Sequence, residues 1–259
     1  MITTNRYTVT ATSISPLRIG GKEDPLSEAD NPVAVVGGRI CLPGPSLKGA
    51  LRGEIERHLN DTFYDRSGKR WLTDKLPFQP CIPSAKLSRD EQRLVREGRY
   101  RARACRYPDG GDGICPACYI LGAQGLVGFA SIPFLFTDVR YDELYSARVE
   151  RTSRTGMQGT NRSYQLVPPD TKFLGILQIL ISDDLLGWQL GHPRPLEEPT
   201  KGDAWLADGE WSSQKVIAEF VLSRIQAIQN LGGYRSKGFG NVEISIEQKS
   251  ESKAQAAPQ

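Results

Sequence analysis

The chain has 259 residues and a formal net charge of +3, from 33 Lys and Arg against 30 Asp and Glu. This length accommodates one large domain or two small ones. The small positive charge does not by itself indicate a nucleic-acid partner, although it is compatible with a local basic groove. No apolar run approaches membrane-spanning length, and the N-terminus lacks the pattern of a signal peptide. We therefore expect a cytoplasmic protein without membrane contact, whose five cysteines are thiols or metal ligands rather than disulfides.

The first predicted elements are strands. Residues 6–13 alternate apolar and polar side chains, which predicts a half-buried strand. Two short strands, 33–36 and 39–42, follow across a Gly-Gly pair. Between them and the first strand lies a loop with four carboxylates, most of which we expect to be solvated. Asp30 differs, because the following Asn-Pro pair forces an extended or turn backbone and the next strand leads directly into a helix.

A loop rich in proline and glycine leads into that first helix, for which Ser46 is the predicted N-cap. Lys48 and Arg52 are four residues apart and therefore share one face. Two cations near the positive end of a helix, with Gly49 leaving the backbone open, favour an anion site, and a phosphate chain is the obvious ligand. The alternative is a capped helix with two solvated cations. Asp30 can lie near this site.

The next segment has no clean periodicity but contains four of the five cysteines. Cys115 and Cys118 form a C-x2-C knuckle, and Cys81 and Cys105 lie upstream among Pro and Gly residues. Four thiolates with one pair at knuckle spacing predict tetrahedral, structural Zn²⁺. The alternative is buried free thiols. Cys41 lies in a predicted strand and is more typical of a core residue, although its replacing a ligand stays open, as does replacement by a histidine.

Apolar residues then predict a strand region over 126–139, and an arginine-rich polar segment follows it. This segment, residues 140–168, favours a long projecting hairpin or a solvated flexible loop. As a hairpin, it would contact a phosphate backbone through Arg151 and Arg154, with Met157 wedged against bases.

The last third predicts a strand over 172–182, a helix over 213–231 and a final strand from 242. A glycine-rich loop precedes that final strand. Its glycines permit close backbone approach to a ligand, and its cations and aromatic rings can bind and stack on it. Paired with the helix that begins at Ser46, the loop becomes a second wall for one phosphate chain. The candidate binding residues in the loop are Gly233, Tyr234, Arg235, Ser236, Lys237 and Gly238.

The predicted elements run strand, helix, strand, hairpin, strand, helix, strand. This order is typical of an α+β fold with a ferredoxin-like, RRM-like core and large insertions. The expected divisions are 1–59, 126–139 and 169–248 for the core, 60–125 for the zinc insertion, 140–168 for the hairpin and 249–259 for a disordered tail.

Three motifs resemble those of the CRISPR repeat-associated mysterious proteins (RAMPs). They are PGPSLKGALR over 43–52, GGYRSKGFG over 232–240 and ADNPV over 29–33. More narrowly, they resemble the repeating backbone subunit of type III interference complexes. The four-cysteine segment resembles zinc insertions of some type III backbone subunits and of fused effectors, which indicates a subtype D relative.

The resemblance implies binding of guide RNA along one face, stacking of copies beside other type III subunits, and a thumb at 140–168 that splays a base from the guide–target duplex. It also implies that the protein cleaves complementary target RNA. In this reaction Asp30 would position the 2′-hydroxyl of the RNA or hold Mg²⁺. Asp24 and Glu28 remain rival carboxylates. The main alternative is a scaffold that binds guide RNA without cutting it. A guide-processing RNase would depend on His58 or His192, and a zinc-ribbon regulator would leave both glycine motifs unexplained.

Overall fold

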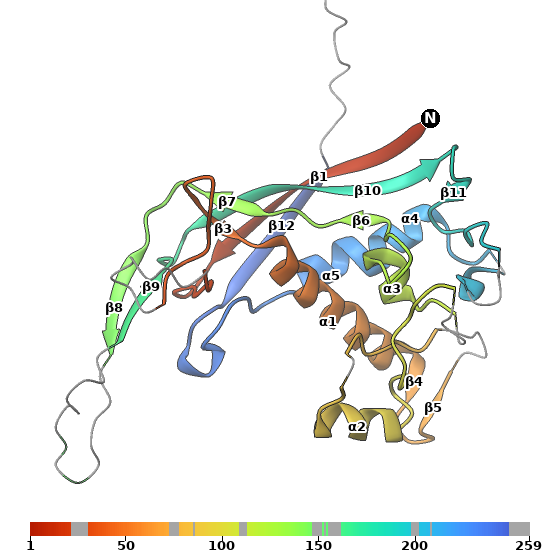
Figure 1. Ribbon diagram of the computed structural model, residues 1–259, viewed down its shortest axis with the longest axis horizontal. Coiled ribbons are helices and arrows are strands. Elements are labelled where there is room, and N and C mark those ends of the chain that lie inside the picture. Colours follow the sequence, from red (N-terminus) through yellow and green to blue (C-terminus); the bar gives the residue numbers. More distant parts are fainter. Residues whose placement is uncertain are drawn as a thin grey trace, which may run out of the picture.

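Figure 1 shows the computed structural model of the chain. The structure describes residues 1–21, 31–72, 78–84, 86–108, 113–146, 152, 154, 162–197, 202–207 and 209–248. Asp30, Arg151 and Met157 lie outside the described residues, as does the tail from 249 onward.

An antiparallel sheet forms one layer of the molecule (Figure 1). Its two longest strands, β1 (Ile2–Ser13) and β10 (Lys172–Asp183), pair along almost their full length. The path through the sheet is β12-β1-β10-β7-β3-β2, and β6 and β11 also pair with β10. The remaining strands of this sheet are β12 (Val242–Gln248), β7 (Leu135–Thr137), β6 (Ala130–Ser131), β3 (Arg39–Leu42), β2 (Val35–Val36) and β11 (Trp188–Gln189). Together with the helices, the sheet gives a mixed α+β fold.

The helices pack against one face of this sheet (Figure 1). Helix α1 (Gly44–Phe63) buries Leu47, Leu51, Ile55 and Leu59 completely, and their four-residue spacing is that of one face of a helix. The second long helix is continuous from residue 213 to 226 but changes type along its length. It consists of α4 (Ser213–Val216), a π-helical turn η3 (Ile217–Leu222) and α5 (Ser223–Gln226).

The predicted end of this second helix at residue 231 is wrong. The chain leaves the helix after Gln226 because its next residues bond to the strand that follows the glycine-rich loop. The Val242 N–H donates to the Gln229 carbonyl at 2.9 Å, and the Leu231 N–H donates to the Gly240 carbonyl at 2.9 Å. These long-range bonds replace the helical ones.

The predicted N-cap of α1 is also wrong. The helix begins at Gly44 with Pro43 as its N-cap, so that Ser46 lies within the first turn. The Ser46 N–H donates to the Pro43 carbonyl at 3.0 Å. Pro45 occupies a first-turn position where a missing N–H costs nothing, so the helix can begin at Gly44, three residues upstream of the start expected after a Ser46 cap.

Two smaller units project from opposite ends of the molecule (Figure 1). At one end, β8 (Asp142–Ser146) and β9 (Arg162–Leu166) form an antiparallel hairpin base. At the other end lie β4 (Tyr64–Asp65), β5 (Arg70–Trp71) and α2 (Arg89–Arg96), whose start is fixed by a capping box between Ser88 and Glu91. The short helix α3 (Pro116–Leu121) carries part of the cysteine segment, and two 3-10 turns, η2 (Ala204–Leu206) and η4 (Arg235–Lys237), lie in later loops. Among the described residues, no helix is long and apolar enough to cross a membrane.

Candidate functional site

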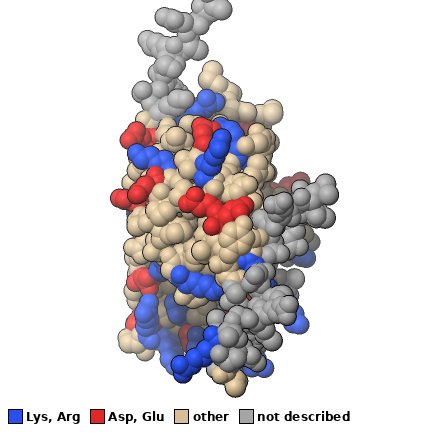
Figure 2. All heavy atoms as spheres, turned by 90° about the vertical axis from the view of Figure 1, so that its left-hand side faces the viewer, with Lys and Arg blue, Asp and Glu red and all other residues tan. Residues whose placement is uncertain are grey.

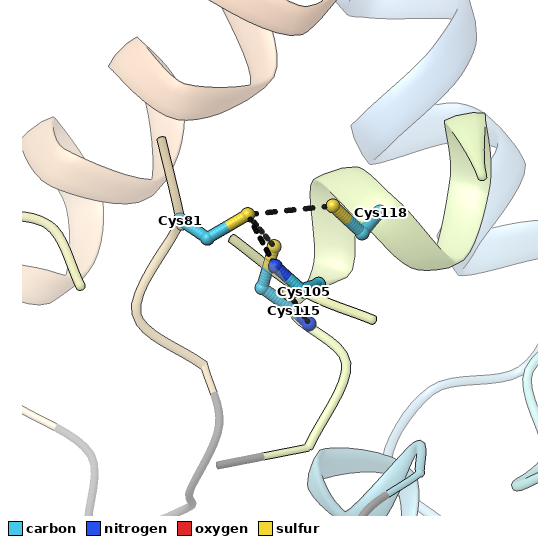
Figure 3. A group of neighbouring side chains, drawn as sticks. All are labelled: Cys81, Cys105, Cys115 and Cys118. Atoms are coloured by element: carbon cyan, nitrogen blue, oxygen red, sulfur yellow. Dashed lines mark hydrogen bonds between the residues drawn. The ribbon is translucent and has the colours of Figure 1, made fainter. Parts of the chain in front are cut away.

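Four cysteines from distant parts of the chain meet beside α1 and α3 (Figure 3). Cys115 caps the N-terminus of α3, Cys118 lies within that helix, and Cys81 and Cys105 come from the preceding loops. All four are buried, and their sulfur atoms lie within 4.8 Å of one another. The prediction that these four residues cluster is confirmed.

The geometry of the cluster fits a tetrahedral metal. Zn–S bonds of about 2.3 Å place the four sulfurs of a tetrahedron about 3.8 Å apart. Here Cys81 Sγ lies 3.5 Å from Cys118 Sγ and 4.0 Å from Cys115 Sγ. None of the five cysteines is in a disulfide, and the fifth, Cys41, is buried in β3 outside the cluster. The donor set and spacing therefore suit structural Zn²⁺, as the sequence predicts.

Two arginines approach the sulfur atoms. Arg52 Nη1 lies 3.4 Å from Cys118 Sγ, and its Nη2 lies 3.3 Å from Cys81 Sγ and 2.9 Å from the Cys81 carbonyl oxygen. Arg101 Nη2 lies 2.7 Å from Cys105 Sγ. Both arginines are more than four-fifths buried, and positive charge is thus concentrated around the thiols.

Arg52 also forms an ion pair with Glu56, one turn further along α1, with Nε 2.7 Å from the carboxylate. Burial raises the pKa of Glu56 to about 7, although the guanidinium opposes this shift. The predicted phosphate contact of Arg52 remains a prediction, but its guanidinium faces thiols and a carboxylate. Lys48 shares this face of α1 as expected, is exposed, and lines a cleft of about 1000 Å³ beside the cysteine cluster.

An adjacent side of α1 lines a different cleft, of about 1040 Å³, which we call the groove. Its second wall is the glycine-rich loop before β12. From the sequence, the start of α1 and the glycine-rich loop are predicted to form two walls of one site. In the structure both line the same cleft. The residues that line the groove include Ser46, Gly49, Gly53 and Arg57 from α1, Gly232, Gly233 and Arg235 from the loop, and Arg18.

Two glycines determine the course of this loop. Gly232 has φ of 78°, and a Cβ atom there would lie 2.3 Å from the Arg18 carbonyl oxygen. Gly240 has φ of 88°, and a Cβ atom there would lie 2.3 Å from the Leu231 carbonyl oxygen. Both positions therefore exclude larger residues, because the conformation and the space each disfavour a side chain. The Gly233 N–H donates to the Arg18 carbonyl at 3.0 Å, which ties the loop to the chain after β1.

A stack of cationic and aromatic side chains connects the loop with the hairpin base. The Arg18 guanidinium lies 4.3 Å from the Tyr234 ring centroid, and the rings of Tyr234 and Tyr164 are 5.4 Å apart and nearly perpendicular. Arg18 also donates to the Asn31 side chain, and the Gln165 N–H donates to the Asn31 carbonyl at 3.1 Å. The residue directly after Asp30 is thus held between the loop and β9, while Asp30 lies outside the described residues.

The remaining candidate residues are more dispersed. Ser236, Lys237 and Gly238 are exposed on the loop, with Lys237 Nζ 4.4 Å from the Tyr234 ring centroid. Arg154 is exposed in a left-handed conformation beyond the end of β8. Figure 2 shows Lys and Arg side chains gathered on the lower part of the face that carries the hairpin.

Two groove residues, Arg57 and Arg235, differ in how well the sequence indicates them. Arg235 belongs to the glycine-rich motif. Arg57 was missed, although it follows Gly49 and Gly53 at four-residue steps and therefore lies on the same side of α1. Arg101 at the metal centre was also missed, since its position depends on the folding of an irregular segment.

Comparison with known proteins identifies the family. Residues 10–243 match the model of the RAMP superfamily. The chain belongs to the RAMP superfamily. No curated protein matches it. Among solved structures, a chain described as a type IV-B CRISPR complex is similar, with 12% identity, a TM-score of 0.48, and coverage of 98% of this chain and 94% of that one.

Proposed function

We propose that this RAMP protein is a guide-RNA-binding scaffold subunit of a CRISPR ribonucleoprotein complex. The observation that carries the proposal is the groove, whose two walls are the two glycine-containing motifs characteristic of the chain. The glycines leave the backbone accessible, and the guanidinium groups of Arg18, Arg57 and Arg235 line it, with Arg57 paired to Glu54 on the same wall. Such a surface suits an RNA backbone rather than particular bases, and base pairing of the guide supplies the specificity for target RNA.

The proposal also includes a narrower assignment within the RAMP superfamily. The three motifs support a type III backbone subunit with a ferredoxin-like core, stacked copies of itself and other type III subunits as neighbours. The cysteine cluster supports a zinc-stabilised insertion. The hairpin formed by β8 and β9 has the position expected of a thumb beside the glycine-rich loop.

Filter binding with guide RNA over a range of salt concentrations tests the groove. Arg57→Ala combined with Arg235→Ala should weaken binding and lower the salt slope by about 1.4, since each phosphate contact contributes about 0.7 for single strands. Arg89→Ala combined with Arg96→Ala removes two exposed arginines of α2, which is the same change in charge outside the groove, and should leave the slope unchanged. Equal losses in all variants would refute the groove. A loss confined to Lys48→Ala would move the site to the other face of α1.

Cleavage of target RNA is a second candidate function, favoured by the position of Asn31. This residue accepts a hydrogen bond from Arg18 and pairs with Tyr164 in the hairpin base, so Asn31 itself adjoins the proposed RNA path. Asp30 would then orient the target 2′-hydroxyl or bind Mg²⁺ through its carboxylate. Arg151 and Met157, in the thumb, would contact the distorted duplex.

A cleavage assay on the assembled complex distinguishes slicing from scaffolding. With guide, complementary RNA and Mg²⁺ present, Asp30→Ala should abolish regular cuts while guide affinity stays unchanged. Asp90→Ala, which removes an exposed carboxylate on α2, serves as the matched control. Cuts that survive Asp30→Ala but vanish in Asp24→Ala or Glu28→Ala would move the chemistry to that rival carboxylate. Binding without cuts by the wild type would leave the scaffold function alone.

A further inference from the structure

The cysteine cluster raises an electrostatic problem that Zn²⁺ alone does not solve. Four thiolates and one Zn²⁺ carry a net charge of −2, and all four cysteines are buried. An uncompensated charge in the protein interior is strongly unfavourable, so buried charges are normally paired. A centre of this composition therefore needs two positive charges nearby.

The two buried arginines supply that charge from separate segments. Arg52 comes from α1 and reaches Cys118 and Cys81 with different nitrogens, at 3.4 and 3.3 Å. Arg101 comes from the cysteine segment, reaches Cys105 at 2.7 Å, and is anchored by a bond to the Gly113 carbonyl at 3.0 Å. Each of these three ligands thus accepts a hydrogen bond from a guanidinium.

We propose that Arg52 and Arg101 form an arginine clasp that offsets the negative charge of the zinc–thiolate centre and retains the metal. Since Arg52 lies on α1, the clasp also fastens the metal-binding segment to the helix whose adjacent side lines the groove. Arg52 is therefore a positioning residue of the metal centre. The clasp requires only the metal site and does not depend on RNA binding.

The fork of the guanidinium explains why arginine occupies position 52. One nitrogen faces each of two sulfur ligands, while Nε pairs with Glu56 at 2.7 Å. A lysine has a single ammonium group and cannot make these contacts in parallel. Arg52→Lys should accordingly preserve the charge but only part of the effect.

Metal retention by the purified full chain tests the clasp. The chain is loaded with Zn²⁺, and metal release to a chromogenic chelator is followed for Arg52→Met, Arg52→Lys and wild type. Loss of a group contacting metal ligands commonly lowers metal affinity about 10–100-fold, and we expect Arg52→Met to fall in that range with Arg52→Lys between it and wild type. Arg89→Met, which removes an exposed cation on α2, should match wild type.

The absorption spectrum of the Co²⁺-loaded protein, followed as the pH is lowered, gives a second measurement. A purely structural role of Arg52 would leave its result unchanged. Removal of a cation from the thiolates favours their protonation, so acid should displace Co²⁺ from Arg52→Met at a higher pH than from wild type. Release rates and acid midpoints of Arg52→Met equal to those of Arg89→Met would overturn the proposal. If Arg52→Met does not fold, Arg52→Lys decides, because its release at the wild-type rate would equally overturn it. Reduced guide affinity with unchanged metal retention would instead assign Arg52 to RNA.

Discussion

The two sides of α1 perform different physical tasks. One side is fastened: Arg52 and Glu56 are buried against the cysteine cluster and one another. The other side is open: Gly49 and Gly53 have no atoms within 4 Å of where a Cβ would be, and they line the groove. The sequence alone suggests one anion site that contains both Arg52 and Gly49. The difference teaches that adjacent residues of a helix can serve a stabilising and a binding role, because they are about 100° apart around its axis.

Loss of the metal should have the largest effect, and it should destabilise the side of α1 that faces the cysteine cluster. Cys115→Ser removes one ligand, and structural zinc sites contribute folding free energy on the order of 10 kcal/mol in small domains. We expect the cysteine segment to lose protection in hydrogen exchange while the sheet of β1 and β10 retains it. The substitution Cys41→Ser, in a cysteine outside the cluster, is the control and should leave metal content unchanged. A wild-type preparation without bound metal would contradict the zinc assignment.

A buried ion pair beside α3, the helix that carries Cys118, gives the next effect. Arg194 and Asp203 are fully buried and joined by two contacts of 2.7 Å, and Arg194 lies over the Tyr119 ring of α3. Asp203→Ala leaves an uncompensated charge in the interior and should cost about 3–5 kcal/mol in the free energy of unfolding. Denaturant titration measures this cost. The exposed Asp90→Ala is the control, and equal values for the two variants would show that the pair is not buried in solution.

On the groove side, Gly232→Ala should cost about 1–3 kcal/mol, the range for strained backbone positions. The added methyl group meets the Arg18 carbonyl, and the left-handed conformation disfavours alanine. Guide affinity should fall together with thermal stability, which differential scanning calorimetry and filter binding record. Gly238→Ala shares the left-handed conformation but has open space, so it separates backbone strain from steric contact.

The smallest expected effect is that of Gly49→Ala, which should increase stability but weaken guide binding. Gly49→Ala should raise the free energy of unfolding by about 0.5–1 kcal/mol, because alanine is the better helix former and nothing obstructs its methyl group. The same methyl group protrudes into the groove and should weaken guide binding. Gain of both stability and affinity would show that RNA does not approach this side of α1.

Much of the architecture could be predicted because it depends on local patterns. The alternation in β1, the helical spacing of Leu47, Leu51 and Ile55, and the knuckle formed by Cys115 and Cys118 are all readable from the sequence. The sequence also pairs the two glycine motifs correctly, since both have the composition of a phosphate-binding wall.

Other features depend on contacts between distant segments. The separation of Arg52 from the groove follows from the position of Cys81 and Cys118, which no spacing within α1 reveals. The early end of the second long helix follows from its pairing with the chain before β12. The roles proposed for Asp30 and Met157 remain predictions, because these residues lie outside the described part of the chain.

The π-helical turn of the second long helix has a consequence for tolerated changes in chain length. A turn that holds one residue more than an α-helical turn is what a single-residue insertion leaves within an existing helix. Ile217, Val221 and Ile225 are all buried in this helix. Deletion of one residue within the π-helical turn should restore a regular helix with Ile225 still facing the core, whereas a deletion in the α-helical part that follows would rotate Ile225 by about 100°. The π-helical turn is therefore the part of this helix that can lose one residue without changing which side chains are buried.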